Sequence, residues 1–330
     1  VNRSKESLTL DLKQPEGANI LHKLLTEADV LVQNLAPGAA ARMGLSYVDL
    51  QAINPKLIVC NISGYGNGGP YQDRKAYDLL IQAEAGFIST TGTTENPSKA
   101  GISIADIAAG MYAYTNILAA LIQRGKSGKG CNIDVSMLEA MTEWMGFPLY
   151  YAYDGAAPPD RTGASHATIF PYGPFVAGDG DTVLFGLQNE REWQSFCKLV
   201  LENPDLVTDL RFTTNSLRVQ NKKALTDCIV AGFSHLTAQQ VIERLESAGI
   251  ANSQMRDMAD VWTHPQLKYR ERWRQVKTST GSVSALIPPG GIGPEPRMDP
   301  VPALGEHTSS ILAELDYTPE QIAALQQKQA

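Results

Sequence analysis

Asp106 lies where a carboxylate could act as a nucleophile. It follows the segment GISIA and opens AGMYAYTNILAALIQ, whose apolar residues recur at helical spacing. The free amides at a helix start favour the ionised form of a carboxylate. An ionised carboxylate in a pocket can attack an activated acyl group and carry it covalently. A lone aspartate at this position is more often an ordinary helix cap, so a catalytic role depends on its neighbours.

A second group of polar residues lies in the segment DRKAYDLLIQ. It places a cation at Lys75, a phenol at Tyr77 and a carboxylate at Asp78, at the expected start of a helix. These three groups together suit a polar ligand. A solvent-exposed helix start explains the same residues, so the group alone does not define a site.

Asn34, Arg42 and Met43 lie in VQNLAPGAAARMGL, where an expected strand ends and a helix begins. Open α/β sheets bind their ligands at such points. Pro37 and Gly38 could instead be there only to form the turn. The segment is therefore a candidate binding loop whose ligand is not identified.

The segment GYGNGGP has the spacing GxGxxG and directly follows the apolar stretch KLIVCNIS, which raises the possibility of a dinucleotide site. Its context argues against that site. Pro70 follows at once, the next residues YQDRK do not open an apolar helix, and no acidic residue ends a second strand at the required distance. We interpret the segment as a flexible loop whose amides can approach a substrate and close over it.

The elements that must position these residues alternate between strands and helices. Strands are expected at SLTLDL (7–12), DVLVQNL (29–35), KLIVCNIS (56–63) and CNIDVSM (131–137), with helices between them. Strands that alternate with helices form crossover units and a parallel sheet. The sequence therefore predicts an α/β fold in which Asp106 begins the helix before the last of these strands.

The composition changes near residue 155, where DGAAPPDR is typical of a linker. A β-hairpin that turns at GDGD is expected over 170–187, followed by several helices. We therefore expect a large domain over 1–155, a linker over 156–164 and a small domain over 165–248. Residues 249–330 are expected to form a second linker and to return to the large domain.

The composition excludes several classes of function. The chain has 330 residues, 43% apolar and 19% charged, and a formal net charge of −7 with both signs interspersed. This argues against nucleic acid or an anionic membrane as the main partner. We expect no stretch of the roughly 20 apolar residues that span a membrane, no signal peptide, and hence a cytoplasmic protein. The four cysteines and five histidines are too scattered for a metal cluster, so no metal site is expected.

Several segments, taken in order, resemble the class III coenzyme A transferases, the family of formyl-CoA transferase and carnitine CoA transferase. They are NRSKESLTLDLKQPEG, VQNLAPGAAARMGLSYVDLQAINPKLIVCNISGYGNGGPY, AYDLLIQAEAG, GISIADIAAGMYA, RGKSGKGCNIDVSMLEA, DLRFTTNSLRVQNK and ALGEHT. So many ordered matches over nearly the whole chain are highly specific. Members of the family usually begin one or two strand–helix units earlier, so we expect a preceding segment.

The resemblance implies a Rossmann-like large domain with a parallel sheet, a smaller α+β domain, and a homodimer whose chains interlock like linked rings. It implies coenzyme A or acyl-CoA as a substrate and no prosthetic group. The family's catalytic aspartate corresponds to Asp106, and an acidic residue near its active site corresponds to Asp78. Its coenzyme-contacting positions correspond to Leu10, Lys13, Asn34, Leu35, Arg42, Met43, Lys75, Tyr77 and Met137.

The resemblance also implies a reaction through covalent intermediates. Asp106 attacks a thioester donor to form a mixed anhydride, then an aspartyl-CoA thioester that an incoming carboxylate resolves. Backbone amides near Asp106 or in the glycine-rich loop, with Gly66 and Gly68 as candidates, are expected to stabilise the tetrahedral oxyanions.

The start of the expected small domain departs from formyl-CoA transferase. The segment SHATIFPYGPF stands where that enzyme has a loop of consecutive glycines. The surrounding stretch looks more like relatives that act on succinyl-CoA and branched dicarboxylates such as itaconate, mesaconate or citramalate. Arg161 and His166 are therefore candidates for orienting the second carboxylate of an acceptor acid.

Two alternatives remain open. An α-methylacyl-CoA racemase of the same superfamily pairs its aspartate with a histidine, and that position is Tyr77 here. A phenol with a pKa of about 10 is a poor base at neutral pH, which disfavours racemisation. The second alternative is a catalytically silent acyl-CoA-binding protein, against which the presence of Asp106 and its polar neighbours argues.

Overall fold

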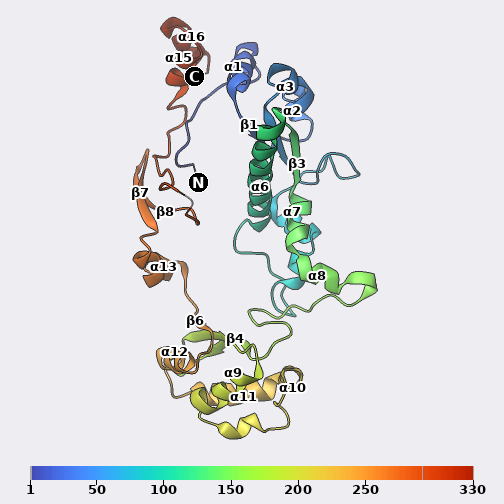
Figure 1. The fold of residues 1–330 in the computed structure, drawn as a ribbon, viewed down its shortest axis with the longest axis vertical. Helices are drawn as coiled ribbons and strands as arrows, with labels where there is room; N and C mark the ends of the chain where they lie inside the picture. The colour runs from blue at the N-terminus through green and yellow to red at the C-terminus, as the bar shows by residue number, and fades with distance from the viewer. Residues whose placement is uncertain (1, 292, 330) are drawn as a thin grey trace. The chain divides into compact units, whose positions relative to one another are not determined.

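The computed structural model describes residues 2–291 and 293–329, which divide into two compact units (Figure 1). The first unit combines the residues up to Ile81, Ile104–Met141 and the residues from Trp262 onward. The second combines Gln82–Ser103 and Thr142–Val261. The domain boundaries expected from the sequence stay predictions.

Helices occupy most of the chain between the strands. Their bounds are α1 (Pro15–Glu27), α2 (Ala39–Arg42), α3 (Tyr47–Ile53), α4 (Asp78–Glu84), α5 (Phe87–Thr90), α6 (Ile104–Ser127), α7 (Met137–Trp144), α8 (Gly146–Tyr151), α9 (Glu190–Ser195), α10 (Asn215–Gln220), α11 (Lys222–Phe233), α12 (Ala238–Ser247), α13 (Met258–Trp262), α14 (Pro265–Tyr269), α15 (Thr308–Glu314) and α16 (Pro319–Gln329), with single turns at η1 (Tyr153–Gly155), η2 (Phe196–Val200) and η3 (Pro204–Val207).

A parallel sheet forms the centre of the first unit. It consists of β1 (Val30–Gln33), β2 (Ile58–Ser63) and β3 (Asn132–Ser136), hydrogen-bonded in the order β1-β2-β3. Helix α6 precedes β3 and lies beside the sheet (Figure 1). The mixed α/β fold with a parallel sheet is therefore confirmed.

The strand expected over residues 7–12 is wrong. This segment joins no sheet, and its backbone amides donate to side chains at the start of α15 instead. The amide of Ser7 donates to Nδ1 of His307 at 3.2 Å, and that of Thr9 donates to Oγ1 of Thr308 at 3.1 Å. Alternating apolar residues predict an extended backbone, but only tertiary contacts decide what that backbone bonds to.

One face of the sheet packs against α6. Cys60 of β2 and Val135 of β3 form a core with the buried Ala108, Ala109 and Ala113 of the helix. Alanines on the facing side let the helix approach the strands closely. Because side chains alternate along a strand, the neighbouring residues of β2 and β3 point to the opposite face.

Among the residues that the structure describes, α6 is long and apolar enough to cross a membrane by length and composition alone. This corrects the expectation that no stretch reaches such a length. Buried alanines on one side of α6 pack in the core of the first unit, and Asp106 lies in its first turn. These features are those of a helix that covers a sheet.

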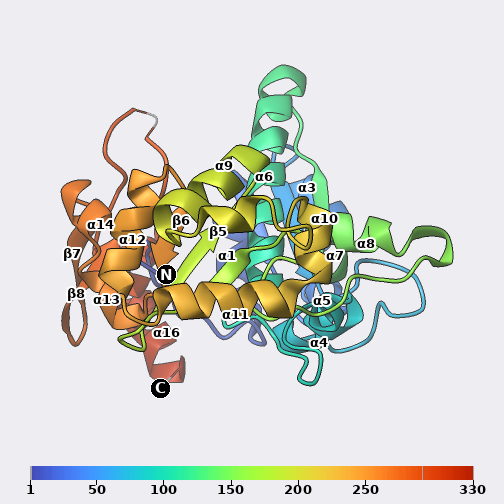
Figure 2. The ribbon, with the colours of Figure 1, turned by 90° about the horizontal axis from the view of Figure 1, so that it is seen from below.

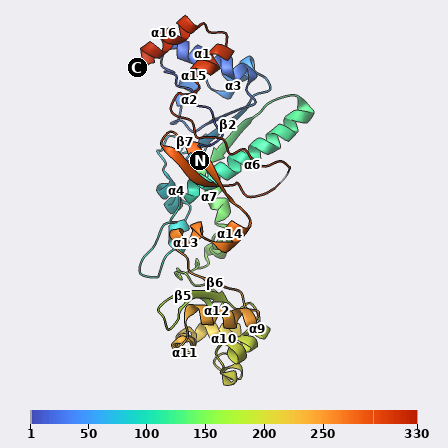
Figure 3. The same cartoon turned by 90° about the vertical axis from the view of Figure 1, so that its left-hand side faces the viewer.

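Helix α1 packs with the two C-terminal helices in the first unit, as Figure 3 shows. Ile20 of α1, Leu312 of α15 and Ile322 of α16 are buried in one cluster. An antiparallel hairpin of β7 (Trp273–Thr278) and β8 (Gly281–Leu286) precedes these C-terminal helices. The sequence analysis did not predict this hairpin.

The second unit contains the expected hairpin. Strands β4 (Tyr172–Val176) and β5 (Thr182–Gly186) pair antiparallel, which confirms the prediction, and β6 (Asn252–Gln254) adds a third strand. Helices α11 and α12 pack against this sheet (Figure 2). The core between them is aromatic, with the Phe185 ring stacked on those of Phe175 and Phe196 at centroid distances of 4.7 and 5.0 Å.

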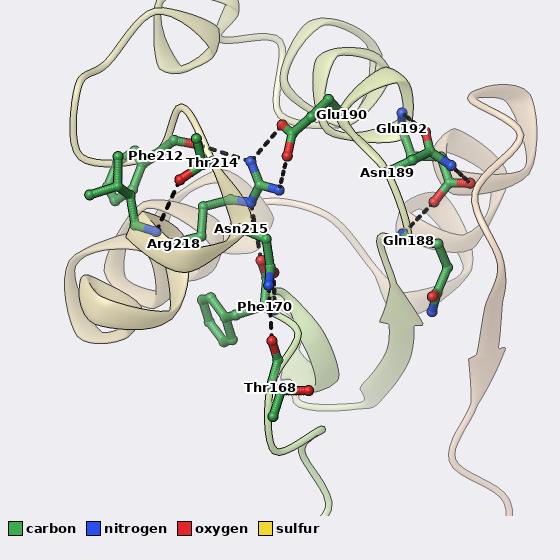
Figure 4. A network of polar contacts seen from close by, with 11 residues as sticks. Thr168, Phe170, Gln188, Asn189, Glu190, Glu192, Phe212, Thr214, Asn215 and Arg218 are labelled. Atoms are coloured by element: carbon green, nitrogen blue, oxygen red, sulfur yellow. Dashed lines mark hydrogen bonds and ion pairs between the residues drawn. The ribbon is translucent and has the colours of Figure 1, made fainter.

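A buried arginine ties this unit together (Figure 4). The side chain of Arg218 is 3% exposed, and its guanidinium binds both carboxylate oxygens of Glu190, at 2.8 and 2.9 Å. It also donates to the backbone carbonyls of Phe170 and Phe212 and lies over the ring of Trp193. A charge so buried is tolerated because several acceptors surround it.

Candidate active site

Asp106 and Asp78 meet at the start of α6. One carboxylate oxygen of Asp78, the first residue of α4, accepts hydrogen bonds from the amides of Ala105 at 2.8 Å and Asp106 at 3.3 Å. These amides are among those a helix leaves without an intrahelical partner. Asp78 therefore fills the capping role that the sequence left open for Asp106.

The environment of Asp106 changes its acidity. Loss of surrounding water raises the pKa of its carboxyl group, and the nearby Asp78 carboxylate raises it further. Both effects disfavour the charged form, so the ionised group becomes more basic. A more basic carboxylate is a stronger nucleophile toward an acyl carbon.

A pocket of about 1110 Å³ lies in the first unit, between the ends of the strands and the start of α6. This volume slightly exceeds the usual range for small-molecule sites, which suits a long ligand. Predicted site residues that line the pocket are Asn34, Leu35, Gly66, Lys75, Tyr77, Asp78, Asp106 and Met137. The structure thus brings together residues from five separate segments of the chain.

Other predicted residues of the first unit lie outside the lining of this pocket. Leu10 packs against the cluster around Ile20, and Met43 packs against the cluster that contains Leu45. Lys13, Arg42 and Gly68 are exposed. Their roles toward a coenzyme stay predictions.

The face of the sheet opposite α6 is polar where it lines the pocket. Gln33 donates from Nε2 to Oδ1 of Asn61 at 2.6 Å, and Asn61 donates from Nδ2 to Oδ1 of Asn132 at 2.7 Å. Gln33 also accepts the amide of Leu35 at 2.6 Å. A row of side-chain amides across three strands therefore holds the loop that carries Asn34 and Leu35.

The glycine-rich loop forms another wall of the pocket. At Gly64 a Cβ atom would lie 2.2 Å from Cβ of Ala76, and Gly66 has a φ of 84°. Both positions require glycine. The amide of Gly66 donates to Ser63, and that of Gly68 donates to Gln72. In this arrangement these two amides, expected to act as oxyanion donors, bind protein oxygens.

Two cations follow this loop. The guanidinium of Arg74 lies 3.5 Å from the ring centroid of Tyr71, which meets Tyr65 edge to face at 5.4 Å. Arg74 and Lys75 are exposed and line the pocket. They could bind the phosphate groups of a ligand. Within residues 2–291 and 293–329, no group of three metal-ligating side chains is found.

Arg161 and His166 lie in the second unit. The guanidinium of Arg161 donates to the carbonyls of Thr93 and Thr94, each at 2.8 Å. Nδ1 of His166 accepts the amides of Thr168 and Ile169, and the ring stacks on that of Tyr172. Both side chains thus hold local backbone, and their role toward an acceptor acid stays a prediction.

Fold and pocket together define an α/β protein with a carboxylate at a helix start that lines a large pocket. The sequence matches CoA-transferase family III over residues 1–308, and the chain belongs to that family of enzymes. It therefore takes part in CoA transfer between acyl-CoA and carboxylic acids.

Named relatives support this placement. The chain is 33% identical to the human (Homo sapiens) succinyl-CoA:glutarate CoA-transferase, over 96% of this chain and 72% of that protein. It is 28% identical to the succinyl-CoA–D-citramalate CoA-transferase of Chloroflexus aurantiacus, over 99% of this chain and 82% of that protein. A crystal structure of a CAIB/BAIF family protein from Brucella suis superposes with a TM-score of 0.85 at 34% identity, covering 96% of this chain and 82% of that one.

Several pocket residues escaped the sequence analysis. Gln33, Asn61, Asn132 and Asp134 all line the pocket from the strands. The sequence did contain a sign of these residues. Polar residues at alternate positions near the end of an apolar strand indicate that one face of the strand is not buried in the core.

Proposed function

We propose that this enzyme transfers coenzyme A from succinyl-CoA to a small dicarboxylate, with Asp106 as the nucleophile. The observation that carries the proposal is the position of Asp106: it lies in the first turn of α6, lines the pocket and has a raised pKa. The names of the relatives include glutarate and D-citramalate, which favours a dicarboxylate acceptor.

In this proposal the reaction begins at the donor thioester. A carboxylate oxygen of Asp106 attacks the thioester carbonyl carbon, the C–S bond breaks, and the coenzyme thiolate leaves a mixed anhydride. The thiolate then attacks the side-chain carbonyl of Asp106, releasing the donor acid and forming an aspartyl-CoA thioester. The acceptor carboxylate repeats these two steps in reverse, so the thioester is preserved throughout.

The test is a screen of free acids against succinyl-CoA. Glutarate, citramalate, mesaconate and itaconate are compared with oxalate and formate, by following the new acyl-CoA chromatographically. Asp106→Ala and Asp106→Asn should abolish transfer, and mass spectrometry of the wild type should find an adduct on Asp106. Transfer that survives in both variants would remove Asp106 from the mechanism. Exchange of an α-proton in deuterated water without an acceptor would instead indicate the racemase.

We also propose that the enzyme is a homodimer with α6 at its interface. Ile107, Met111, Tyr114, Leu118 and Ile122 recur at helical spacing along α6 and are 42% to 67% exposed. An apolar stripe of this length is costly to leave in water. Light scattering after gel filtration should give twice the chain mass, and Met111→Glu should reduce it toward one chain. The matched control, Lys126→Glu at the other end of α6, should leave the dimer intact.

A further inference from the structure

The glycine-rich loop, residues 64–72, is tied to the sheet by a carboxylate. Oδ2 of Asp134, in the middle of β3, accepts the amide of Asn67 at 3.0 Å. Two further bonds hold the start of the loop: Gly66 donates to Oγ of Ser63, and Leu138 donates its amide to the carbonyl of Gly64. Of these three bonds, the one to Asp134 lies furthest along the loop.

Asp134 occupies a position where its charge is a disadvantage. Its register partner on β2 is Asn61, so it belongs to the polar face of the sheet and lines the pocket. A ligand that carries phosphate groups is repelled by a carboxylate in the same pocket. The hydrogen bond that Asp134 accepts from the amide of Asn67 therefore explains the presence of this carboxylate better than contact with such a ligand does.

A second carboxylate, that of Asp78, fixes the other end of the segment that begins at Asn67. From Asn67 the chain continues through Arg74 and Lys75 to Asp78, which is fixed to the first amides of α6. The segment that carries the two cations is therefore held at both ends. If the first end is released, only a fraction of molecules holds that arrangement, and the apparent affinity falls by the same fraction.

We propose that Asp134 is a positioning residue that keeps the glycine-rich loop in place for coenzyme binding. The inference rests on the proposed function, since it takes acyl-CoA as the occupant of the pocket. Asp134 acts through the amide of Asn67, and what it contributes is an acceptor at a fixed position.

Three substitutions separate the acceptor from the charge. Asp134→Asn keeps an acceptor oxygen and removes the charge, Asp134→Ala removes both, and Asp134→Glu keeps the charge but moves the acceptor by one methylene. Ala and Glu should raise the KM for succinyl-CoA and the Kd for CoA about tenfold, equivalent to about 1.4 kcal/mol. Since only binding is affected, kcat should change by less than about twofold. Asn should bind as tightly as the wild type or more tightly.

The matched control is Asp73→Ala. Asp73 also lines the pocket, so its loss removes the same charge without touching the amide of Asn67. This variant should not weaken CoA binding. If Asp134→Ala binds CoA as tightly as the control does, Asp134 contributes only charge and the proposal is wrong. Thermal unfolding checks the fold, and Asp134→Glu carries the test if the alanine variant does not fold.

Hydrogen exchange tests the loop without any ligand. Amides of residues 64–72 should exchange faster in the Ala and Glu variants than in the wild type and Asn variant. Equal exchange in all four proteins would overturn the proposal. Faster exchange together with no CoA binding by the wild type would leave the role of Asp134 intact and refute the proposed function instead.

Discussion

Removing Asp78 should affect both the stability of α6 and the acidity of Asp106. Asp78 accepts two amides of the first helical turn, at 2.8 and 3.3 Å. Leaving those amides without their acceptor in Asp78→Ala should cost roughly 1–2 kcal/mol of unfolding free energy. A loss of that size lowers the melting temperature by about 2–8 °C. Asp78→Asn retains an acceptor oxygen and should melt close to the wild type.

The two variants should behave alike in their pH dependence. In the proposed mechanism Asp106 must be ionised to attack, so activity should fall as the pH drops through its pKa. Burial is the larger cause of its raised pKa and the Asp78 carboxylate the smaller. Either substitution removes only the smaller cause. The acidic limb of the kcat/KM profile should therefore move to lower pH, but the pKa that it reports should stay above that of an ordinary aspartate.

The assay is a pH series of CoA transfer, with thermal unfolding at each pH. If the acidic limb of the kcat/KM profile lies at the same pH in both variants as in the wild type, Asp78 does not influence the charge of Asp106. Equal destabilisation by Asn and Ala would show that the hydrogen bonds to the helix start are not what Asp78 contributes.

Three further predictions concern other parts of the chain. Arg218→Met should destabilise the second unit by roughly 1–3 kcal/mol in denaturant unfolding, because the buried carbonyls of Phe170 and Phe212 lose their donor, whereas the half-exposed carboxylate of Glu190 can be hydrated. The bond to Arg218 lowers the pKa of Glu190, so this stabilisation is present above the ordinary glutamate pKa and should be lost as the pH falls through the lowered value. Asn61→Ala should interrupt the amide row and raise the KM for acyl-CoA with little change in kcat, as steady-state kinetics would show. Burial raises the pKa of Cys197 to about 12 and that of Cys60 above its usual value, so neither should react with a thiol reagent until the protein unfolds.

Much of the fold could be predicted from local pattern. The apolar runs that became β1, β2 and β3 and the helix behind Asp106 were recognisable because their periodicity matches their structure. The hairpin at Tyr172–Gly186 was recognisable from its turn residues. The segment 7–12 misled because its alternation indicates an extended chain and carries no information about the partner, which is the start of α15.

The site was harder to predict, because its contacts join distant parts of the chain. Asp106 and Lys75 could be proposed as single residues from their types and places. Asp78 caps α6 only because two segments that lie 28 residues apart in the sequence meet in the fold. The row from Gln33 to Asn132 depends on the register of three strands, which no local pattern specifies.

The alternation of β2 and β3 links the fold to the site. Cys60 and Val135 face the alanines of α6, while their neighbours Asn61 and Asp134 face the pocket. A shift of β3 by one residue would reverse its faces, placing Asp134 against α6 and Val135 in the pocket. Burying an unpaired carboxylate there is prohibitively costly. The polar residues that line the pocket therefore also help to specify the register of the sheet, so that substitutions on this face should be judged by both stability and binding.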